Sequence, residues 1–196
     1  MFVRSLSLGV AAAALLVGGA QAADLIIPTT PQPIYEAAGF NWEGLYAGVR
    51  LGGSWLGDTN TLGNVVAVGG TAGAGVIGGA VGVNFIPADP FLLGAEVTGD
   101  YVWYNGTSSG EFFANLRAGA VVTDLVLVYA LGGDGVQTNS NVTTGLYQLG
   151  GGVELAVTDA ITVRGELVGQ GDFNNGGAND PFFDSAKATV GVFYHF

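Results

Sequence analysis

Residues 188–196, ATVGVFYHF, form the last stretch of the chain and decide how the rest is interpreted. Every second residue is apolar, whereas the residues between them form a more polar set that only Phe193 interrupts. A period of two is typical of a β-strand whose two faces meet different surroundings. The apolar set consists of Ala188, Val190, Val192, Tyr194 and Phe196.

The first residues of the chain predict export. Residues 1–22 carry one cation, Arg4, then an apolar run from Leu6 to Val17, then Ala20-Gln21-Ala22. This layout is typical of a secretory signal peptide that is cleaved after a small residue. A membrane anchor is the alternative, but the run is shorter than the ~20 apolar residues of a spanning helix. We interpret residues 23–39, which contain prolines and no period, as a flexible periplasmic leader.

The composition is unusual for a soluble domain. Glycine accounts for 35 of 196 residues, charged residues for 11%, and there is no cysteine. A soluble domain has about 25% charged residues, and without cysteine neither a disulfide framework nor thiol chemistry is available. After Val17 no apolar stretch approaches the length of a membrane helix. For an exported apolar chain, this combination favours a closed β-barrel, in which every backbone group is paired.

Eight segments of alternating polarity predict the fold class, an all-β, eight-stranded, antiparallel, up-and-down transmembrane barrel over residues 40–196. Short links alternate with longer, more polar links, as the periplasmic turns and external loops of such barrels do. The longer links are residues 56–74, 105–110, 137–144 and 172–184. The segments are residues 42–55, 75–85, 91–104, 111–122, 125–136, 145–157, 160–171 and 185–196.

The four Lys and Arg residues of the segments, and four of their carboxylates, lie at alternating positions that face one side of the sheet. We assign this side to the barrel interior. A cation that faces lipid at mid-depth costs ~2–4 kcal/mol, whereas buried charges are tolerated when they are paired. The predicted interior network comprises Arg50, Glu96, Asp100, Arg117, Glu154, Arg164, Glu166 and Lys187. The expected pairs are Arg50 with Glu96 or Asp100, Arg117 with Glu96 or Glu154, and Arg164 with Glu154 or Glu166.

The fifth segment is apolar on both faces, so its parity is the hardest to assign. Placing Leu125, Leu127, Tyr129 and Leu131 outward leaves Asp134 inside, which is the assignment we favour. Near the first segment, Trp42 falls on the inward parity. We expect it to precede the regular strand or to cap the periplasmic mouth.

Aromatic residues near the segment ends predict two belts at the membrane interfaces. At the loop ends of outward faces lie Trp55, Trp103, Phe112 and Tyr147, and at the turn ends lie Phe85, Tyr194 and Phe196.

Several stretches resemble a known family. These are NWEGLYAGVRLGGSW, FLLGAEVTGDYVW, LGGGVELAVTDAITVRGEL and the closing VGVFYHF. Together they resemble the small OmpA-like outer-membrane barrels of alphaproteobacteria, over about residues 40–196. The resemblance implies a barrel in the outer membrane of a Gram-negative bacterium, inserted by the barrel-assembly machinery. In that family the machinery reads the last strand and its terminal aromatic residue, which are Tyr194 and Phe196 here.

The sequence offers little for catalysis. Nucleophilic hydrolysis needs a nucleophile, a histidine and an orienting group, and the one histidine, His195, has aromatic neighbours. We therefore expect it to fill the barrel mouth or to pair with a turn carboxylate. With one His and no Cys, a metal centre is not expected either. The glycines of residues 69–82 lack the following helix and lysine of a phosphate loop. We predict no enzyme activity, no cofactor and no metal.

Three functional hypotheses follow. The favoured one is a monomeric structural barrel that contributes to envelope integrity and displays surface loops. Its partners would be outer-membrane lipid and lipopolysaccharide, and its acidic charge would repel nucleic acid. The second is a narrow porin-like channel for ions or small molecules, suggested by inward glycines. The third is a lipid-modifying enzyme dependent on His195.

Overall fold

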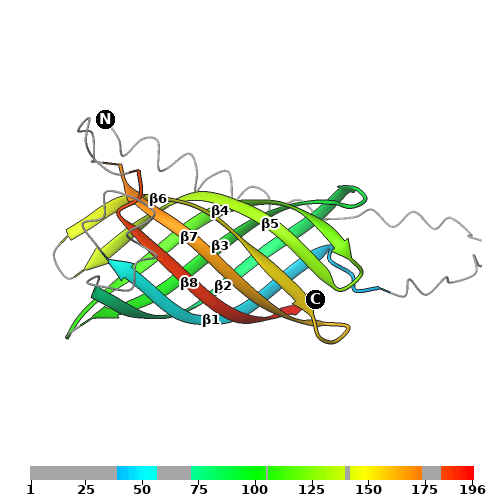
Figure 1. Cartoon of the computed structure of the whole chain (residues 1–196), viewed down its shortest axis with the longest axis horizontal. Coiled ribbons are helices and arrows are strands. Elements are labelled where there is room, and N and C mark those ends of the chain that lie inside the picture. Colours follow the sequence, from blue (N-terminus) through cyan, green and yellow to red (C-terminus); the bar gives the residue numbers. More distant parts are fainter. Residues whose placement is uncertain (1–38, 57–71, 105, 140–141, 174–181) are drawn as a thin grey trace, which may run out of the picture. The chain divides into compact units, whose positions relative to one another are not determined.

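The computed structural model describes residues 39–56, 72–104, 106–139, 142–173 and 182–196. The predicted signal peptide (1–22) and all but the last residue of the predicted leader (23–39) lie outside the described residues. Within the described ranges, eight antiparallel strands close into a barrel in chain order (Figure 1). They are β1 (Gly44–Leu56), β2 (Ala72–Ala88), β3 (Phe91–Tyr104), β4 (Thr107–Thr123), β5 (Val126–Asn139), β6 (Val142–Ala156), β7 (Ile161–Asp172) and β8 (Ser185–His195). This part of the chain includes no helix of the length and apolar character needed to cross a bilayer.

The sheet closes because β8 pairs with β1 along most of its length, from Tyr46 opposite His195 to Leu56 opposite Ser185. The strands are also staggered. A path that starts at Tyr46 and follows the paired residues through all eight strands returns to β1 at Leu56. This offset is the shear of the barrel, which tilts the strands and sets its width. With eight strands, the interior is just wide enough for side chains to fill.

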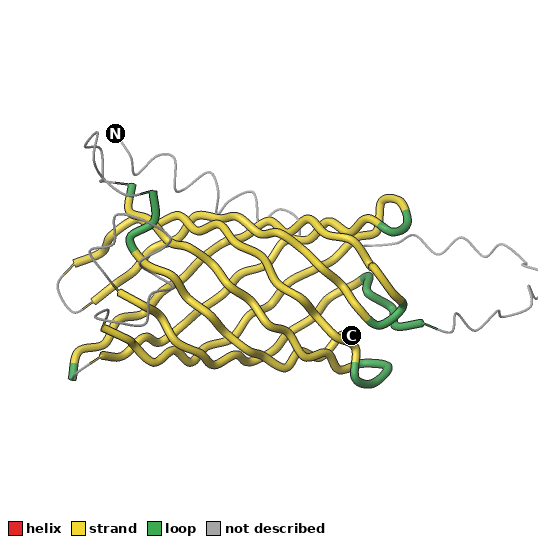
Figure 2. Tube along the Cα trace, viewed as in Figure 1, coloured by secondary structure: helices red, strands yellow, loops and turns green. Residues whose placement is uncertain are grey.

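The two ends of the barrel differ. The short turns β2–β3, β4–β5 and β6–β7 lie at one end, which also holds the C-terminus (Figures 1 and 2). At the other end, the predicted links 105–110 and 137–144 were too long. Tyr104 already pairs with Thr107, and Asn139 with Val142. Their polar residues continue the strands because each one finds a backbone partner on the neighbouring strand.

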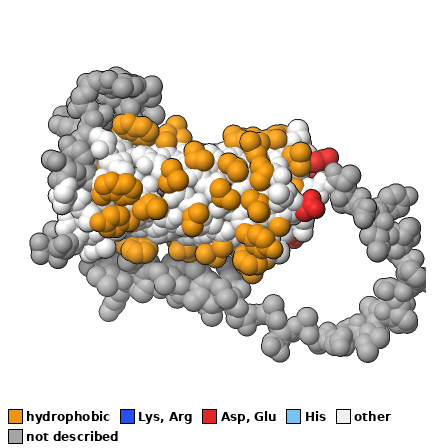
Figure 3. All heavy atoms as spheres, turned by 90° about the horizontal axis from the view of Figure 1, so that it is seen from below, with side chains coloured by type: hydrophobic (Ala, Val, Ile, Leu, Met, Phe, Trp, Pro, Cys, Tyr) orange, Lys and Arg blue, Asp and Glu red, His pale blue; other side chains and the backbone are white. Residues whose placement is uncertain are grey.

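Side chains alternate between the outside and the inside of the barrel. The alternation predicted for residues 188–196 is confirmed, with Val190, Val192 and Tyr194 exposed and Phe193 and His195 buried. Figure 3 shows hydrophobic side chains spread over the visible outer face, with acidic side chains at the short-turn end. The large apolar residues that are about half exposed or more include Leu45, Val49, Leu51, Ile77, Val81, Leu93, Val97, Leu116, Leu167 and Val190.

The predicted parity of the fifth segment was wrong. Leu127, Tyr129 and Leu131 are buried inside the barrel, and Asp134 is exposed on the outside. Leu125 precedes the strand and is exposed. With apolar residues on both faces, the only cue was the carboxylate, and it pointed the wrong way. The side chain that belongs inside is Tyr129, because its hydroxyl donates to the buried Glu166.

The interior is packed along its length. At the short-turn end, Trp42 is 2% exposed and packs against Leu92 and Leu127, so it fills this mouth as expected. A second apolar cluster comes from Ala74, Val76 and Val102, whose strand positions place it toward the other end. The charged residues lie on the inner wall along with these clusters, so their neighbours are protein side chains.

Candidate functional site: the buried charge network

All eight charged residues predicted for the interior are buried, and each takes part in at least one ion pair. They come from β1, β3, β4, β6, β7 and β8, at positions whose side chains alternate inward with the pleat. Arg164 and Glu154 are opposite each other on the neighbouring strands β7 and β6. Arg117 and Glu96 also lie on neighbouring strands, β4 and β3. The other ion pairs of the network join strands that are not neighbours in the sheet.

One group of ion pairs joins two arginines with two glutamates. Arg164 Nε lies 3.0 Å from Glu154 Oε2, and its Nη1 lies 2.5 Å from Glu96 Oε2. Arg117 Nη2 lies 3.0 Å from the same Glu154 oxygen, and Arg117 Nη1 lies 3.8 Å from Glu96 Oε2. Each carboxylate thus meets two guanidinium groups. Such mutual pairing is what makes buried charge tolerable.

A second group of ion pairs centres on Asp100. Arg50 donates to it with two nitrogens, Nε to Oδ1 at 2.9 Å and Nη2 to Oδ2 at 2.6 Å, and Arg50 Nη1 reaches Glu166 Oε1 at 3.0 Å. Lys187 Nζ lies 2.8 Å from Asp100 Oδ2 and also pairs with Glu111. The two-point contact fixes the guanidinium plane, which a single bond would not.

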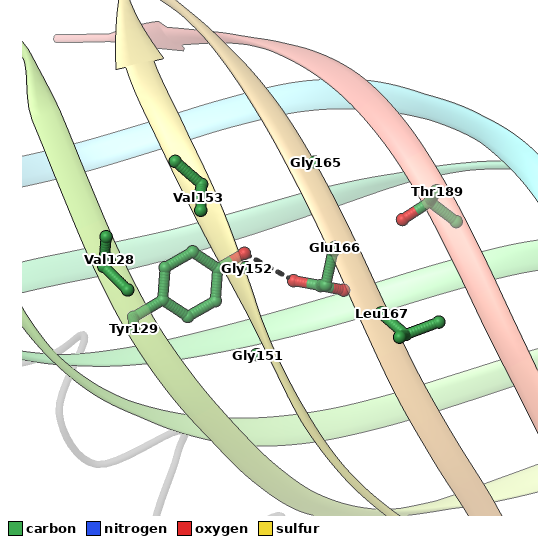
Figure 4. Close-up of a pocket in the computed structure, with 9 residues that line it drawn as sticks. All are labelled: Val128, Tyr129, Gly151, Gly152, Val153, Gly165, Glu166, Leu167 and Thr189. Atoms are coloured by element: carbon green, nitrogen blue, oxygen red, sulfur yellow. Dashed lines mark hydrogen bonds between the residues drawn. The ribbon is translucent and has the colours of Figure 1, made fainter. Parts of the chain in front are cut away.

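Aromatic side chains complete both groups. Tyr46 donates to Glu96 Oε2 at 2.8 Å and accepts a bond from Arg117 Nη1 at 2.6 Å. Tyr129 donates to Glu166 Oε2 at 2.7 Å, a bond drawn in Figure 4. The Arg117 guanidinium lies 3.9 Å from the Tyr129 ring centre, and the Arg164 guanidinium 3.7 Å from that of Phe193. The faces of these aromatic rings attract the guanidinium cations and cover them.

Glycines make room for these rings. A Cβ on Gly48 would overlap the Phe193 ring, and one on Gly152 would overlap the Tyr129 hydroxyl. The Phe193 ring therefore packs directly over Gly48 of β1. This explains why an aromatic residue interrupts the polar face of the last strand. Figure 4 shows the region around Gly152, where Gly151 and Gly165 leave a shallow hollow in the wall between Val128, Val153 and Leu167.

The expected pairings can be compared with the geometry. Arg50 pairs with Asp100 and not with Glu96, Arg117 pairs with both expected glutamates, and Arg164 pairs with Glu154 and not with Glu166. Four ion pairs were missed: Arg50 with Glu166, Arg164 with Glu96, and Lys187 with both Asp100 and Glu111. Glu111 shares its parity with Arg117, so the sequence did contain the signal for it. Tyr129 was missed because the parity of β5 was misassigned.

The predicted aromatic belt residues lie on the outside. Trp55, Trp103 and Phe112 are 37%, 45% and 54% exposed. Tyr147 is half-buried because its ring packs against those of Phe173 and Phe182, and its hydroxyl donates to the carbonyl of Phe182. At the short-turn end, Phe85, Tyr194 and Phe196 are exposed, and the last two rings meet edge to face at 5.1 Å.

The described contacts of His195 lack the arrangement of a catalytic relay. Its Nε2 lies 3.1 Å from Glu154 Oε1 and 3.4 Å from Thr162 Oγ1, while its Nδ1 is buried and has no partner among the described residues. A relay needs the nucleophile on one ring nitrogen and the orienting carboxylate on the other. Of the two expectations for His195, filling the barrel mouth is the one observed, since its ring packs with those of Phe40 and Trp42. Its carboxylate partner, Glu154, belongs to β6 and not to a turn. Among the described side chains, no group of three or more His, Cys, Asp and Glu residues is placed to hold a metal ion.

No protein-family model and no curated protein sequence matches the chain. Solved structures do match. The crystal structure of Ail, the attachment invasion locus protein of Yersinia pestis, gives a TM-score of 0.52 at 9% identity over 79% of this chain and 99% of that one. Ail in complex with the heparin analogue sucrose octasulfate gives 0.48 at 10% identity, over 79% and 97%. A designed transmembrane β-barrel gives 0.45 at 15% identity, over 80% and 99%. The first comparison shows that this chain shares its fold with Ail.

Proposed function

We propose that this protein is a structural barrel of the Gram-negative outer membrane, which contributes to the integrity of the envelope, displays surface loops and does no catalysis. The observation that carries the proposal is the inverted distribution of polarity. Large apolar side chains lie on the outside, while the arginines and the lysine of the described residues are buried and paired inside.

Physical chemistry favours a membrane for such a surface. Contiguous apolar area of this extent would drive association in water, whereas hydrocarbon accepts it. The closed sheet suits the same surroundings, because a barrel pairs every strand and leaves no open edge. The fold shared with Ail agrees with this location. The resemblance to OmpA-like barrels of alphaproteobacteria remains a prediction from the sequence.

A packed interior favours a structural role over a channel. Inward glycines suggested a partly open lumen, but the space beside Gly48 is taken by Phe193, beside Gly152 by Tyr129, and beside Gly150 by Val168. The ion pairs and the rings that pack on them fill the interior beside the apolar clusters. A narrow channel for ions or small molecules is therefore the weaker alternative.

The proposal includes the route of insertion and the partners. Tyr194 and Phe196 are exposed on the outside at the short-turn end, where the barrel-assembly machinery could read them and lipid could then surround them. The remaining partners are outer-membrane lipid and lipopolysaccharide, with the protein as a monomer.

Planar-bilayer recording tests the proposal. Purified, folded protein should show negligible conductance, because the ion pairs and packed rings leave no continuous aqueous path. The variant Arg50→Ala should be less stable but should stay closed, since its neighbours in the second ion-pair group still fill the section. Stable steps of porin size in the native protein would contradict the structural role. Steps that appear only in Arg50→Ala would favour a plugged channel.

A further inference from the structure

The residues just before β1 cross the short-turn mouth of the barrel. We call Gly39–Glu43 the strap. Its Phe40 N–H and its Trp42 indole N–H both donate to the carbonyl of Asp124, each at 3.4 Å. Asp124 lies in the β4–β5 turn, which is on the opposite side of the ring of strands from β1. On the way, Asn84 of β2 donates to the Trp42 carbonyl at 3.2 Å. Three hydrogen bonds therefore hold the strap, two to the β4–β5 turn and one to β2.

The inner side of the strap covers the ion pairs that Glu154 makes with Arg117 and Arg164. The Phe40 and Trp42 rings meet the His195 ring edge to face, with centres 4.9 and 6.1 Å apart. On its other side His195 stacks on Tyr46 at 5.3 Å and contacts Glu154. One layer of rings thus separates the mouth from the carboxylate that joins Arg117 and Arg164.

Some contacts of the strap favour its closed position over the mouth, and others oppose it. Burying Trp42 against Leu92 and Leu127 favours the closed position. Two features oppose it: the two bonds to Asp124 are long, and the buried His195 Nδ1 has no partner within the described part of the chain. A buried polar group without a partner gains by meeting water. A segment with few strong bonds at the start of a strand is also where local opening begins.

We infer that the strap is a gate at this mouth: it separates the charged interior from solvent, and it lifts as a unit to admit water and small ions to His195 and Glu154. The inference concerns one end of the barrel. It does not require a through-pore, so it can fail while the structural role stands.

Thiol labelling tests the gate. The chain has no cysteine, so all labelling comes from the one cysteine that is introduced. Thr162→Cys places a thiol on the inner wall beside His195, where the native side chain is fully buried. In detergent micelles, a small cationic methanethiosulfonate should react slowly with this thiol. Adding Phe40→Ala and Trp42→Ala should raise the rate about tenfold or more, as expected for local opening.

Two controls separate the gate from general loosening. Phe85→Ala removes an exposed ring at the same end and should leave the rate at Thr162→Cys unchanged. Ala74→Cys reports from the loop half of the inner wall, and its rate should not respond to the strap substitutions. Equal rates at Thr162→Cys with intact and altered strap would overturn the gate, as would an equal rise at Ala74→Cys.

A locked variant keeps the test decisive if the strap substitutions prevent folding. A Cβ on Gly39 would lie 3.2 Å from Asp124 Cβ, close to the separation of a disulfide. In Gly39→Cys with Asp124→Cys, oxidation should slow hydrogen exchange of the Trp42 indole N–H, and reduction should restore it. Exchange that is the same in the oxidised and reduced forms would contradict a strap that lifts.

Discussion

Arg164 shows at the scale of one residue how the interior is held. Its guanidinium contacts Glu96 and Glu154 and lies over the Phe193 ring. It therefore links β7 to β3, β6 and β8 within one side chain. Few other groups have this reach, because only arginine offers several donors in a fixed plane together with a face that stacks on rings.

Replacing Arg164 should be costly. Arg164→Met leaves Glu96 and Glu154 with fewer partners, so the free energy of unfolding should fall by about 3–5 kcal/mol, as when one member of a buried pair is removed. Urea titration of the protein in micelles measures this. The double variant Arg164→Met with Glu96→Gln should recover part of the loss. A loss within about 1 kcal/mol, typical of an exposed pair, would show that the network is not buried as described.

At the scale of elements, the seam between β1 and β8 depends on glycine. Gly48→Ala would drive a methyl group into the Phe193 ring and the Val192 carbonyl. Overpacking of this kind costs about 1–3 kcal/mol. Gly165→Ala is the matched control, since a Cβ there meets no atom within 4 Å. Glycine inside a strand lowers the stability of that strand, so alanine can raise it at a position with free space. Thermal unfolding should show a lower midpoint for the first variant and an unchanged or higher one for the second. Equal effects would refute the packing at the seam.

The elements also show what the sequence could predict. Strands such as β8 have one apolar face and one polar face, so their alternation defined both the strand and its orientation. β5 has no such contrast. Its orientation depends on the bond between Tyr129 and Glu166 and on the space over Gly152, which are contacts between strands. Alternation within one strand carries no information about them.

The same limit applies to the charge network. Parity alone placed the eight charged residues inside. Their partners depend on the stagger of the strands, which brings Arg50 of β1 to Glu166 of β7. The lengths of the segments and of the links between them do not determine that stagger. Glu111 is different, because its parity was readable and only its position at the edge of the predicted segment hid it.

At the scale of the whole molecule, polarity is inverted relative to a soluble protein. The interior holds ion pairs together with apolar clusters, and the exterior holds valine, leucine and aromatic side chains. Among the described strand residues, Asp134 departs from this pattern: its carboxylate is exposed on the outer face, and it is paired in register with Tyr147 of the predicted loop-end belt. Near an interface such a charge costs ~1 kcal/mol or less, so it is compatible with the rest.

Photolabelling by lipid tests this inversion most directly. The side chains of Val49 and Val192 point outward, and those of Ala80 and Thr189 point inward. The native protein is reconstituted into vesicles whose lipid carries a photoactivated carbene precursor in the acyl chain, and mass spectrometry identifies the modified residues. We expect modification at Val49 and Val192 and little at Ala80 and Thr189. Modification that is equal at all four positions, or stronger at the inward pair, would contradict the inversion.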